Sequence, residues 1–190
     1  MDRTPERMPD QIYDEWLVIR SQDGEPGALA ELVARWNGRL LGFALGITRR
    51  EDSARDAVQA AWMAAARDIG RLRDPARFPA WILRLVSNKC ADAARRDRRA
   101  RRAERGRARD RGERIVNRTA SASDLDERSE VREAIAALGP AQREILGLHY
   151  GAGLGIAEIA SCLGVPAGTV KSRLHAARAE LRAILERRAR

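Results

Sequence analysis

Apolar residues recur at intervals of three and four along most of the chain, and this spacing predicts an all-α fold. In the first half the pattern predicts helices over residues 10–20, 26–47, 50–69 and 78–96. The first of these is short, and Ile12, Trp16 and Ile19 share its apolar face. The second follows the break SQDGEPG and opens at Pro26 within it, since proline suits the first turn of a helix.

The second half shows the same helical spacing in shorter segments. One helix ends at Gly139-Pro140, and the next covers residues 141–150 with Ile145 and Leu148 facing inward. Before them, residues 112–129 are polar and lack any period, which is typical of a flexible linker. The pattern therefore predicts two small helical domains, an N-terminal bundle and a C-terminal domain, joined by a linker.

The last two helices meet at a very short turn, in the stretch IAEIASCLGVPAGTVKSRLHAAR. Gly155 can cap the first helix, since Glu158 can reach back to its amide. Gly164 stands where a helix ends in a left-handed residue, and Pro166 suits the first turn of the next helix. This arrangement predicts a helix-turn-helix motif.

The second helix of this motif separates apolar from polar residues. Its apolar stripe comprises Val170, Leu174, Ala177 and Leu181. Off the stripe lie Lys171, Ser172, His175 and Arg178. A basic, hydroxyl-bearing face in the N-terminal half of a second helix indicates a helix that reads DNA. An ordinary helical hairpin with a solvated charged face is the alternative, because it has the same spacing.

The charge composition favours a polyanionic partner. The net charge is +9, and Lys89 and Lys171 are the only lysines, so arginine supplies nearly all of the positive charge. Ten arginines lie within residues 95–111, beside three acidic residues. We expect this run to combine two roles, a solvated spacer and a neutraliser of phosphates. Residues 1–31 hold eight acidic and three basic residues, so this end is not expected to face DNA.

The residue types that catalysis needs do not form a recognisable set. Cys90 and Cys162 are far apart and have no neighbouring histidine, which favours free thiols over a disulfide or a zinc site. His149 and His175 are the only histidines, and no phosphate loop or metal spacing appears. We therefore expect no enzymatic activity, no cofactor and no metal. Without a long apolar run or a lipidation signal, we expect a cytoplasmic protein that does not insert into a membrane.

Four stretches resemble the sigma-70 family of bacterial sigma factors, in particular its extracytoplasmic-function (ECF) group. LGVPAGTVKSRLHAAR resembles the family's promoter-recognition helix, and LGPAQREILGLHY resembles the segment before it. EDSARDAVQAAWMAA resembles the helix that docks on the clamp helices of the largest RNA polymerase subunit. FPAWILRLVSNKCADAARR is similar to the segment, loop and helix that open and read the downstream (−10) promoter element.

This resemblance implies three groups of site residues. Those that contact core RNA polymerase are Asp52, Asp56 and Gln59. Those that read the −10 element are Asn88, Lys89, Asp92, Arg95 and Arg96, with Asn88 in a loop against a flipped base. Those that read the upstream (−35) element are Thr169, Lys171, Ser172, Arg173, His175 and Arg178. For Asn88 the alternative is a residue inside a helix. For Trp81, in the segment that resembles the −10 region, the alternative to a role at the promoter is a position in the core.

The chain is thus identified as a member of the ECF group. The resemblance implies an N-terminal arm over residues 1–25, a polymerase-binding and −10 domain over 26–98, a basic flexible linker over 99–128 and a −35 domain over 129–190. It implies that the protein binds core RNA polymerase and promoter DNA and directs promoter recognition, melting and transcription initiation. It leaves an anti-sigma factor open as a third partner. The alternative function is a stand-alone helix-turn-helix regulator that binds duplex DNA without polymerase.

Overall fold

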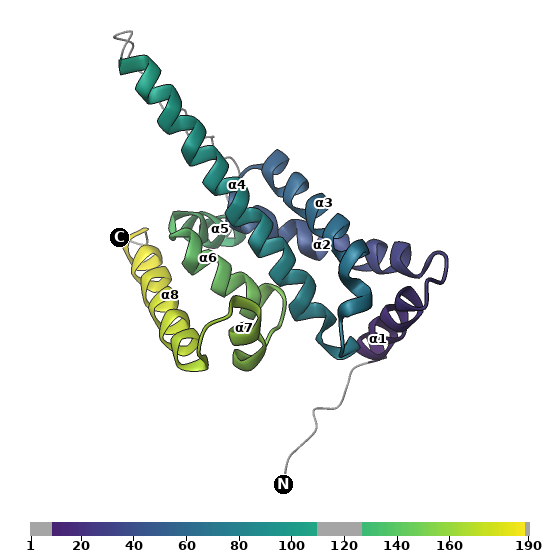
Figure 1. Cartoon of the computed structure of the whole chain (residues 1–190). Helices are drawn as coiled ribbons and strands as arrows, with labels where there is room; N and C mark the ends of the chain where they lie inside the picture. Colours follow the sequence, from purple (N-terminus) through teal and green to yellow (C-terminus); the bar gives the residue numbers. More distant parts are fainter. Residues whose placement is uncertain (1–8, 110–126, 189–190) are drawn as a thin grey trace.

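A computed structural model of the protein describes residues 9–109 and 127–188, and every element in these two ranges is helical (Figure 1). The first range contains α1 (Pro9–Gln22), α2 (Ala28–Thr48), α3 (Glu51–Asp68), the short turns η1 (Ile69–Arg71) and η2 (Pro75–Arg77), and α4 (Phe78–Arg109). The second contains α5 (Glu127–Ala137), α6 (Pro140–Leu146), the π-helical turn η3 (Gly147–Gly151), α7 (Ile156–Leu163) and α8 (Ala167–Arg188). The predicted all-α fold is confirmed.

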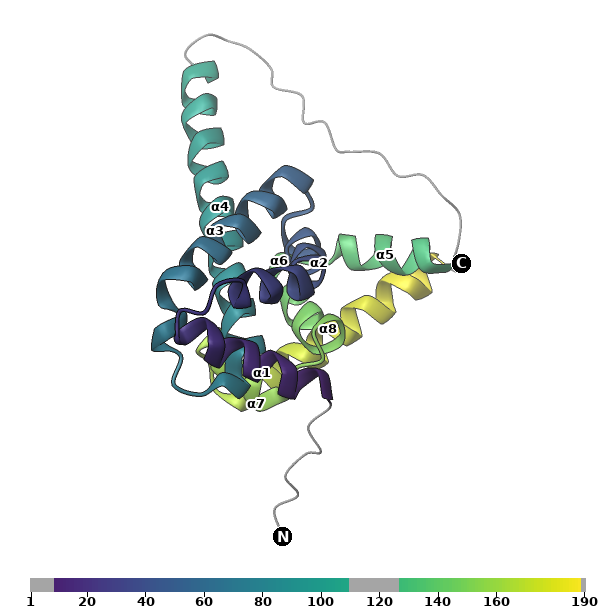
Figure 2. The ribbon, with the colours of Figure 1, turned by 90° about the vertical axis from the view of Figure 1, so that its right-hand side faces the viewer.

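The helix α4 covers the predicted helix 78–96 and continues into the arginine run. The sequence allowed this continuation, because arginine and alanine favour helix, but we expected order to be lost past Gly106 within a linker over 99–128. In the structure α4 extends to Arg109. Figures 1 and 2 show this end of α4 projecting from the rest of the molecule. Of the other residues predicted as arm or linker, 1–8 and 110–126 lie outside the described ranges.

The N-terminal bundle is centred on the aromatic ring of Phe78. This side chain is fully buried at the start of α4, with its ring centroid 5.6 Å from that of Trp36, 6.5 Å from Trp62 and 6.2 Å from Trp81. Such ring pairs add stabilisation beyond the area that they bury. The cluster joins α2, α3 and α4, and so holds the outer faces of α3 and α4 in fixed positions.

The helix α1 packs on the bundle through a different face from the one that its apolar spacing predicts. Leu17 and Val18 have no exposed surface. Ile12, Trp16 and Ile19, which share the predicted apolar face, are 55%, 45% and 47% exposed. The helix therefore has two apolar faces, and only one of them is covered.

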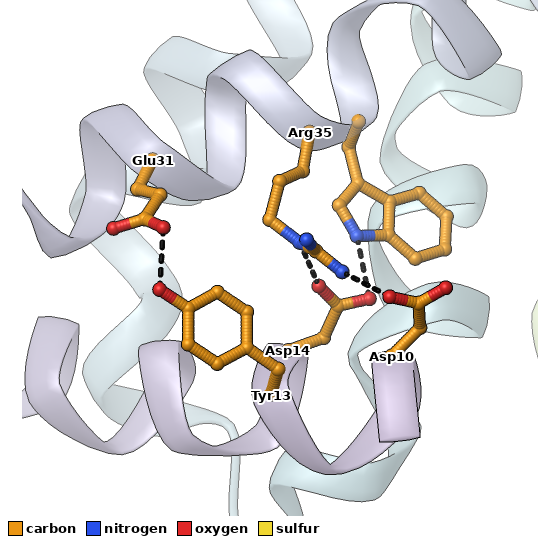
Figure 3. Close-up of polar contacts among 6 residues, drawn as sticks. Asp10, Tyr13, Asp14, Glu31 and Arg35 are labelled. Carbon is orange, nitrogen blue, oxygen red and sulfur yellow. Dashed lines mark hydrogen bonds and ion pairs between the residues drawn. The ribbon is translucent and has the colours of Figure 1, made fainter. Parts of the chain in front are cut away.

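A buried carboxylate fastens α1 to α2 (Figure 3). Asp14 is 4% exposed and accepts hydrogen bonds from Nε of Arg35 at 2.8 Å and from Nε1 of Trp36 at 3.0 Å. Arg35 also reaches the exposed Asp10 at 3.3 Å. A buried charge persists only where hydrogen bonds and an opposite charge replace its hydration, and Asp14 has both.

The two halves of the chain pack against each other and share one hydrophobic cluster. The helix α6 lies on α2, and α7 lies on α4. At Gly147 a Cβ atom would lie 3.1 Å from the ring of Phe43, so this close approach favours glycine. Ser87 on α4 also donates a hydrogen bond to the carboxylate of Glu144 on α6. The two predicted helical domains are therefore in direct contact in this structure.

Arg143 on α6 is the most extensively bonded polar group between the halves. Its guanidinium donates to the carbonyl oxygens of Gly46 at 2.8 Å and Ile47 at 3.1 Å, near the C-terminal end of α2. It also donates to the carbonyl oxygens of Ala136 and Leu138 in its own half. Carbonyl groups at a helix end lack helical partners and attract cations, so this contact is favourable. Burial, with a smaller effect from Arg49, lowers the pKa of Arg143.

Both cysteines are free and buried, which confirms the interpretation from their spacing. Burial, together with the nearby carboxylate of Glu144, raises the pKa of Cys90 and of Cys162 to about 12. Both thiols therefore remain protonated at neutral pH, and neither is a reactive thiolate.

Candidate nucleic-acid interface

The helix-turn-helix comprises α7 and α8 and has the predicted caps. The N–H of Gly155 donates to Oε2 of Glu158 at 2.7 Å. Gly164 ends α7 with a φ of 66°, the left-handed region that glycine adopts without strain. Pro166 directly precedes α8, and its carbonyl accepts a hydrogen bond from the N–H of Thr169 at 2.9 Å. The turn is thus set by contacts within a few residues.

The helix α8 buries its apolar stripe and presents polar side chains to solvent. Val170, Leu174 and Ala177 are buried and Leu181 is half-buried, as the spacing predicts. The residues predicted to read the −35 element occupy the rest of its N-terminal half: Lys171, Ser172, Arg173, His175 and Arg178 are exposed and Thr169 is half-buried. The separation of faces expected of a DNA-reading helix is present.

Three of these side chains have distinct settings. The hydroxyl of Ser172 donates to the carbonyl of Thr169 at 3.0 Å, which leaves its oxygen as an acceptor. At about 100° per residue, Arg173 and Arg178 border the buried stripe on its opposite edges. The guanidinium of Arg178 lies 5.4 Å from the ring centroid of Tyr150, so it is directed toward η3. Ser172 and His175 face away from the stripe, and Lys171 lies between His175 and Arg178.

The five residues predicted to read the −10 element lie along one face of α4. At about 100° per residue, they occupy an arc opposite the buried Val86 and Cys90. Asn88, Arg95 and Arg96 are exposed, and Lys89 and Asp92 are half-buried. Asp92 accepts a hydrogen bond from Arg95, and this bond holds the pKa of Asp92 below its usual range.

The loop that we expected at Asn88 is not present. The helix α4 is continuous across this position, so Asn88 lies inside a helix, as in the alternative interpretation. Asparagine is a poor helix former, but Val86 before it and Cys90 after it are buried in the bundle. This packing stabilises the helix through Asn88. The side chain nevertheless faces solvent.

The three residues predicted to contact polymerase share an exposed face of α3. Asp52, Asp56 and Gln59 are all exposed and follow one another at helical spacing. The opposite face, which includes Ala57 and Val58, is buried in the bundle. This arrangement leaves two carboxylates and an amide in position to meet a partner.

The structure also shows a polar cavity that the sequence pattern did not indicate. A cavity of about 570 Å³ lies between η1, η2 and the start of α4 and is lined by Asp68, Arg71, Leu72, Arg73, Asp74, Arg77 and Trp81. Trp81 is half-buried, so its ring is partly in the core, as predicted, and partly in the cavity wall. Three arginines within the short stretch RLRDPARF were the available signal. An aromatic ring beside guanidinium groups can hold an unstacked base and its phosphate.

Comparison with known proteins identifies both halves. The family model Sigma-70 region 2 matches residues 32–100, and Sigma-70, region 4 matches residues 128–181. The ECF RNA polymerase sigma factor SigM of Mycobacterium tuberculosis is 32% identical over 182 residues, covering 90% of this chain and 84% of SigM. The RNA polymerase sigma factor CarQ of Myxococcus xanthus is 28% identical over 166 residues, covering 87% of this chain and 94% of CarQ.

Two solved structures are similar along most of the chain. A chain in the structure of CnrH in complex with the cytosolic domain of CnrY is 28% identical with a TM-score of 0.65, covering 92% of this chain and 97% of that one. A chain in the complex of the sigma factor RpoE with the anti-sigma factor NepR from Bartonella quintana shares the fold, with a TM-score of 0.63 and 23% identity over 84% of this chain and 98% of that one.

The matched regions occur in one chain and in the order that the sequence motifs indicate. A stand-alone helix-turn-helix regulator needs only the second of them, so the alternative function is not supported. With a curated relative above 30% identity along most of its length, the family is established. The chain belongs to the ECF group of the sigma-70 family and is an RNA polymerase sigma factor.

Proposed function

We propose that the two halves of this sigma factor divide promoter recognition between them. Residues 26–98 bind core RNA polymerase and the −10 element, and residues 129–190 read the −35 element. The outer face of α8 carries this proposal, because Lys171, Ser172 and His175 are exposed on its first turns. In helix-turn-helix proteins this part of the second helix enters the major groove.

The polymerase contact is tested with core RNA polymerase in the absence of DNA. We expect stoichiometric co-elution, followed by run-off transcription when promoter DNA is added. Alanine at Asp52, Asp56 and Gln59 together should weaken co-elution. Alanine at Arg67, which is exposed on the same helix, serves as the control. Binding of DNA without any binding of polymerase would reject the proposal.

For −35 recognition we expect Lys171→Ala and Arg173→Ala each to reduce discrimination for a matched element. A lysine or arginine that pairs with the two acceptors of guanine contributes roughly 1–3 kcal/mol, which is about 5- to 150-fold in relative affinity. Binding of the holoenzyme to matched and scrambled elements measures the effect. Arg182→Ala, an exposed change farther along α8, is the control. Unchanged affinity for both elements would remove these residues from the interface.

For the −10 element we propose that the outer face of α4 holds the melted strand. Lys89, Arg95 and Arg96 neutralise phosphates, while Asn88 and Asp92 line the path of the bases. Trp81 falls on the same helical face at about 100° per residue, so the arginine-lined cavity continues this surface. An asparagine can donate to and accept from a base edge, which compensates for lost stacking.

Asn88→Ala is therefore expected to impair promoter opening and little else. Open-complex formation should fall on a duplex promoter and recover on a template whose downstream element is already mismatched, because the mutant lacks only the group that captures the base. Permanganate footprinting reports the opening, and binding to core polymerase and to the −35 element should be unaffected. Opening at the parental level would make Asn88 a structural residue only.

The remaining features of this proposal concern location and partners. None of the helices within the described ranges is both long and apolar enough to cross a membrane. We infer a cytoplasmic protein that performs no chemistry of its own and relies on polymerase for nucleotide addition. Two similar structures are complexes, one with the cytosolic domain of CnrY and one with an anti-sigma factor. We therefore infer that an anti-sigma factor is a third partner.

A further inference from the structure

Exposed apolar side chains are concentrated on one short helix. Eight large hydrophobic side chains are exposed in the described ranges, and four of them, Ile12, Tyr13, Trp16 and Ile19, belong to α1. The other four are Leu45, Met63, Val131 and Tyr150, each on a different element. Single exposed apolar residues are normal on protein surfaces, but a contiguous group marks an interaction site.

This exposed face is not needed to hold α1 in place. At about 100° per residue, Ile12, Trp16 and Ile19 lie in one row along the helix. The buried Leu17 and Val18, together with the Asp14 hydrogen bonds, attach the helix through its other side. The row also precedes residues 32–100, the segment that the region 2 model matches. It is therefore additional to both the packing of α1 and the matched family region.

The indole of Trp16 is held ready for contact. The Tyr13 ring stacks on it, with centroids 5.4 Å apart and an interplanar angle of 29°. The guanidinium of Arg20 lies 4.2 Å from the centroid of the Trp16 ring and is itself bonded to Glu25. A side chain fixed before binding loses little entropy on binding, and tryptophan, tyrosine and arginine are the commonest residues of binding hot spots.

Acidic groups surround the row, in contrast to the rest of the protein. Residues 9–31 contain six acidic residues and one arginine, whereas the whole chain has a net charge of +9. The two arginines that contact the rings of this face are paired with carboxylates: Arg20 bonds to Glu25, and Arg35 bonds to Asp14 and Asp10. On η1 and η2, which pack against α1, Arg71 is paired with Asp68 and Arg77 with Asp74. Glu31, on α2, accepts a hydrogen bond from Tyr13 at 2.5 Å (Figure 3). The local field therefore favours cations.

This charge selects the class of partner. Nucleic acid and anionic membranes are repelled by an acidic surface. A second copy of the same face brings like charges together, which is unfavourable. The residues proposed for polymerase lie on α3, whereas α1 packs against α2, α4, η1 and η2. A protein segment with an apolar stripe between lysines or arginines complements the row and its border.

We propose that the exposed face of α1 is a docking site for a cationic amphipathic helix of a protein other than polymerase. The apolar stripe of this helix packs along Ile12, Trp16 and Ile19, as in other helix-to-surface recognition. Its cations meet acidic side chains beside the row, Asp23 and Glu25 after the end of α1 and Glu31 next to Tyr13.

The test uses the full chain and a designed 18-residue helical peptide with a leucine stripe flanked by lysines. A twin peptide carries glutamate at every lysine position. Calorimetry should show that Ile12→Gln, Trp16→Gln and Ile19→Gln together lower the affinity for the lysine peptide about thirtyfold or more, the loss typical of a hot spot. The matched control, with glutamine at Leu45, Met63 and Val131, should bind this peptide with an affinity within about twofold of the parent's. The glutamate twin should bind at least about tenfold more weakly than the lysine peptide.

Several results would overturn the proposal. Equal affinity of the lysine peptide for the parent and the α1 variant would remove this face as its site, and equal affinity of the two peptides would remove the charge preference. A parental dimer that the α1 variant dissolves would assign the face to self-association. Reduced binding to core polymerase would assign it to the holoenzyme. If the triple variant does not fold, Ile12→Gln alone supplies the comparison, since Ile12 is 55% exposed.

Discussion

Asp14→Ala is expected to lower the free energy of unfolding by about 2–3 kcal/mol. The change removes the acceptor for Nε1 of Trp36, which is 5% exposed, and leaves Arg35 without its closest carboxylate. A buried donor left without an acceptor costs about 1–3 kcal/mol, whereas Arg35 is exposed and keeps Asp10, so its loss adds about 1 kcal/mol at most. For a chain of this size the melting temperature should fall by roughly 4–12 °C. Calorimetry and urea unfolding measure both quantities.

The control for this prediction is Asp10→Ala in the same helix. Asp10 is exposed and meets Arg35 at 3.3 Å, so its loss should change stability by no more than about 0.5 kcal/mol. Similar destabilisation by both changes would mean that the overall charge of α1 matters, and that the buried hydrogen bonds of Asp14 do not.

Arg143→Ala is expected to loosen the contact between the two halves. The change removes hydrogen bonds to carbonyl groups at the end of α2 and before α6, two of them at 2.8 and 3.1 Å. Hydrogen bonds from charged donors contribute about 1.5–3 kcal/mol each and are not additive, so we expect a loss of about 3 kcal/mol. That loss changes the ratio of closed to open molecules by a factor on the order of 100. Small-angle scattering should then report a larger radius of gyration.

Arg132→Ala provides the comparison, because Arg132 is exposed on α5 and its removal changes the net charge equally. This variant should scatter like the parent. If Arg143→Ala does so too, the apolar contact between the halves, including Phe43 against Gly147, is sufficient to keep them together.

The sequence predicted the parts of the fold that depend on nearby residues. The ends of α7 follow from Gly155 with Glu158 and from Gly164, which act within one helical turn. The buried stripe of α8 follows from helical spacing alone. The packing of α6 on α2 depends on contacts such as that of Phe43 with Gly147, and residues so far apart leave no periodic signal.

The same limit explains the differences at the candidate site. Spacing showed that α1 has apolar residues on one face, but it could not show that Leu17 and Val18 pack instead of Ile12 and Trp16. The family resemblance implied a loop at Asn88, but the helix predicted over 78–96 is continuous there, because packing of its buried face outweighs the low helix propensity of asparagine. The cavity at Trp81 forms only when the η1–η2 segment folds back on α4. The spacing of the arginines in RLRDPARF matched no known motif, so the sequence did not predict it.

During synthesis the N-terminal bundle leaves the ribosome before the surface that covers it exists. Ribosomes add about 5–20 residues per second, so the interval from residue 98 to residue 147 lasts about 2–10 s. Throughout that time the contact that Gly147 makes with Phe43 is missing, and the apolar side of α2 meets water. Nascent chains with such surfaces are bound by chaperones or aggregate. A copy that terminates before residue 147 keeps this apolar surface exposed, so it is expected to aggregate more readily than the full chain.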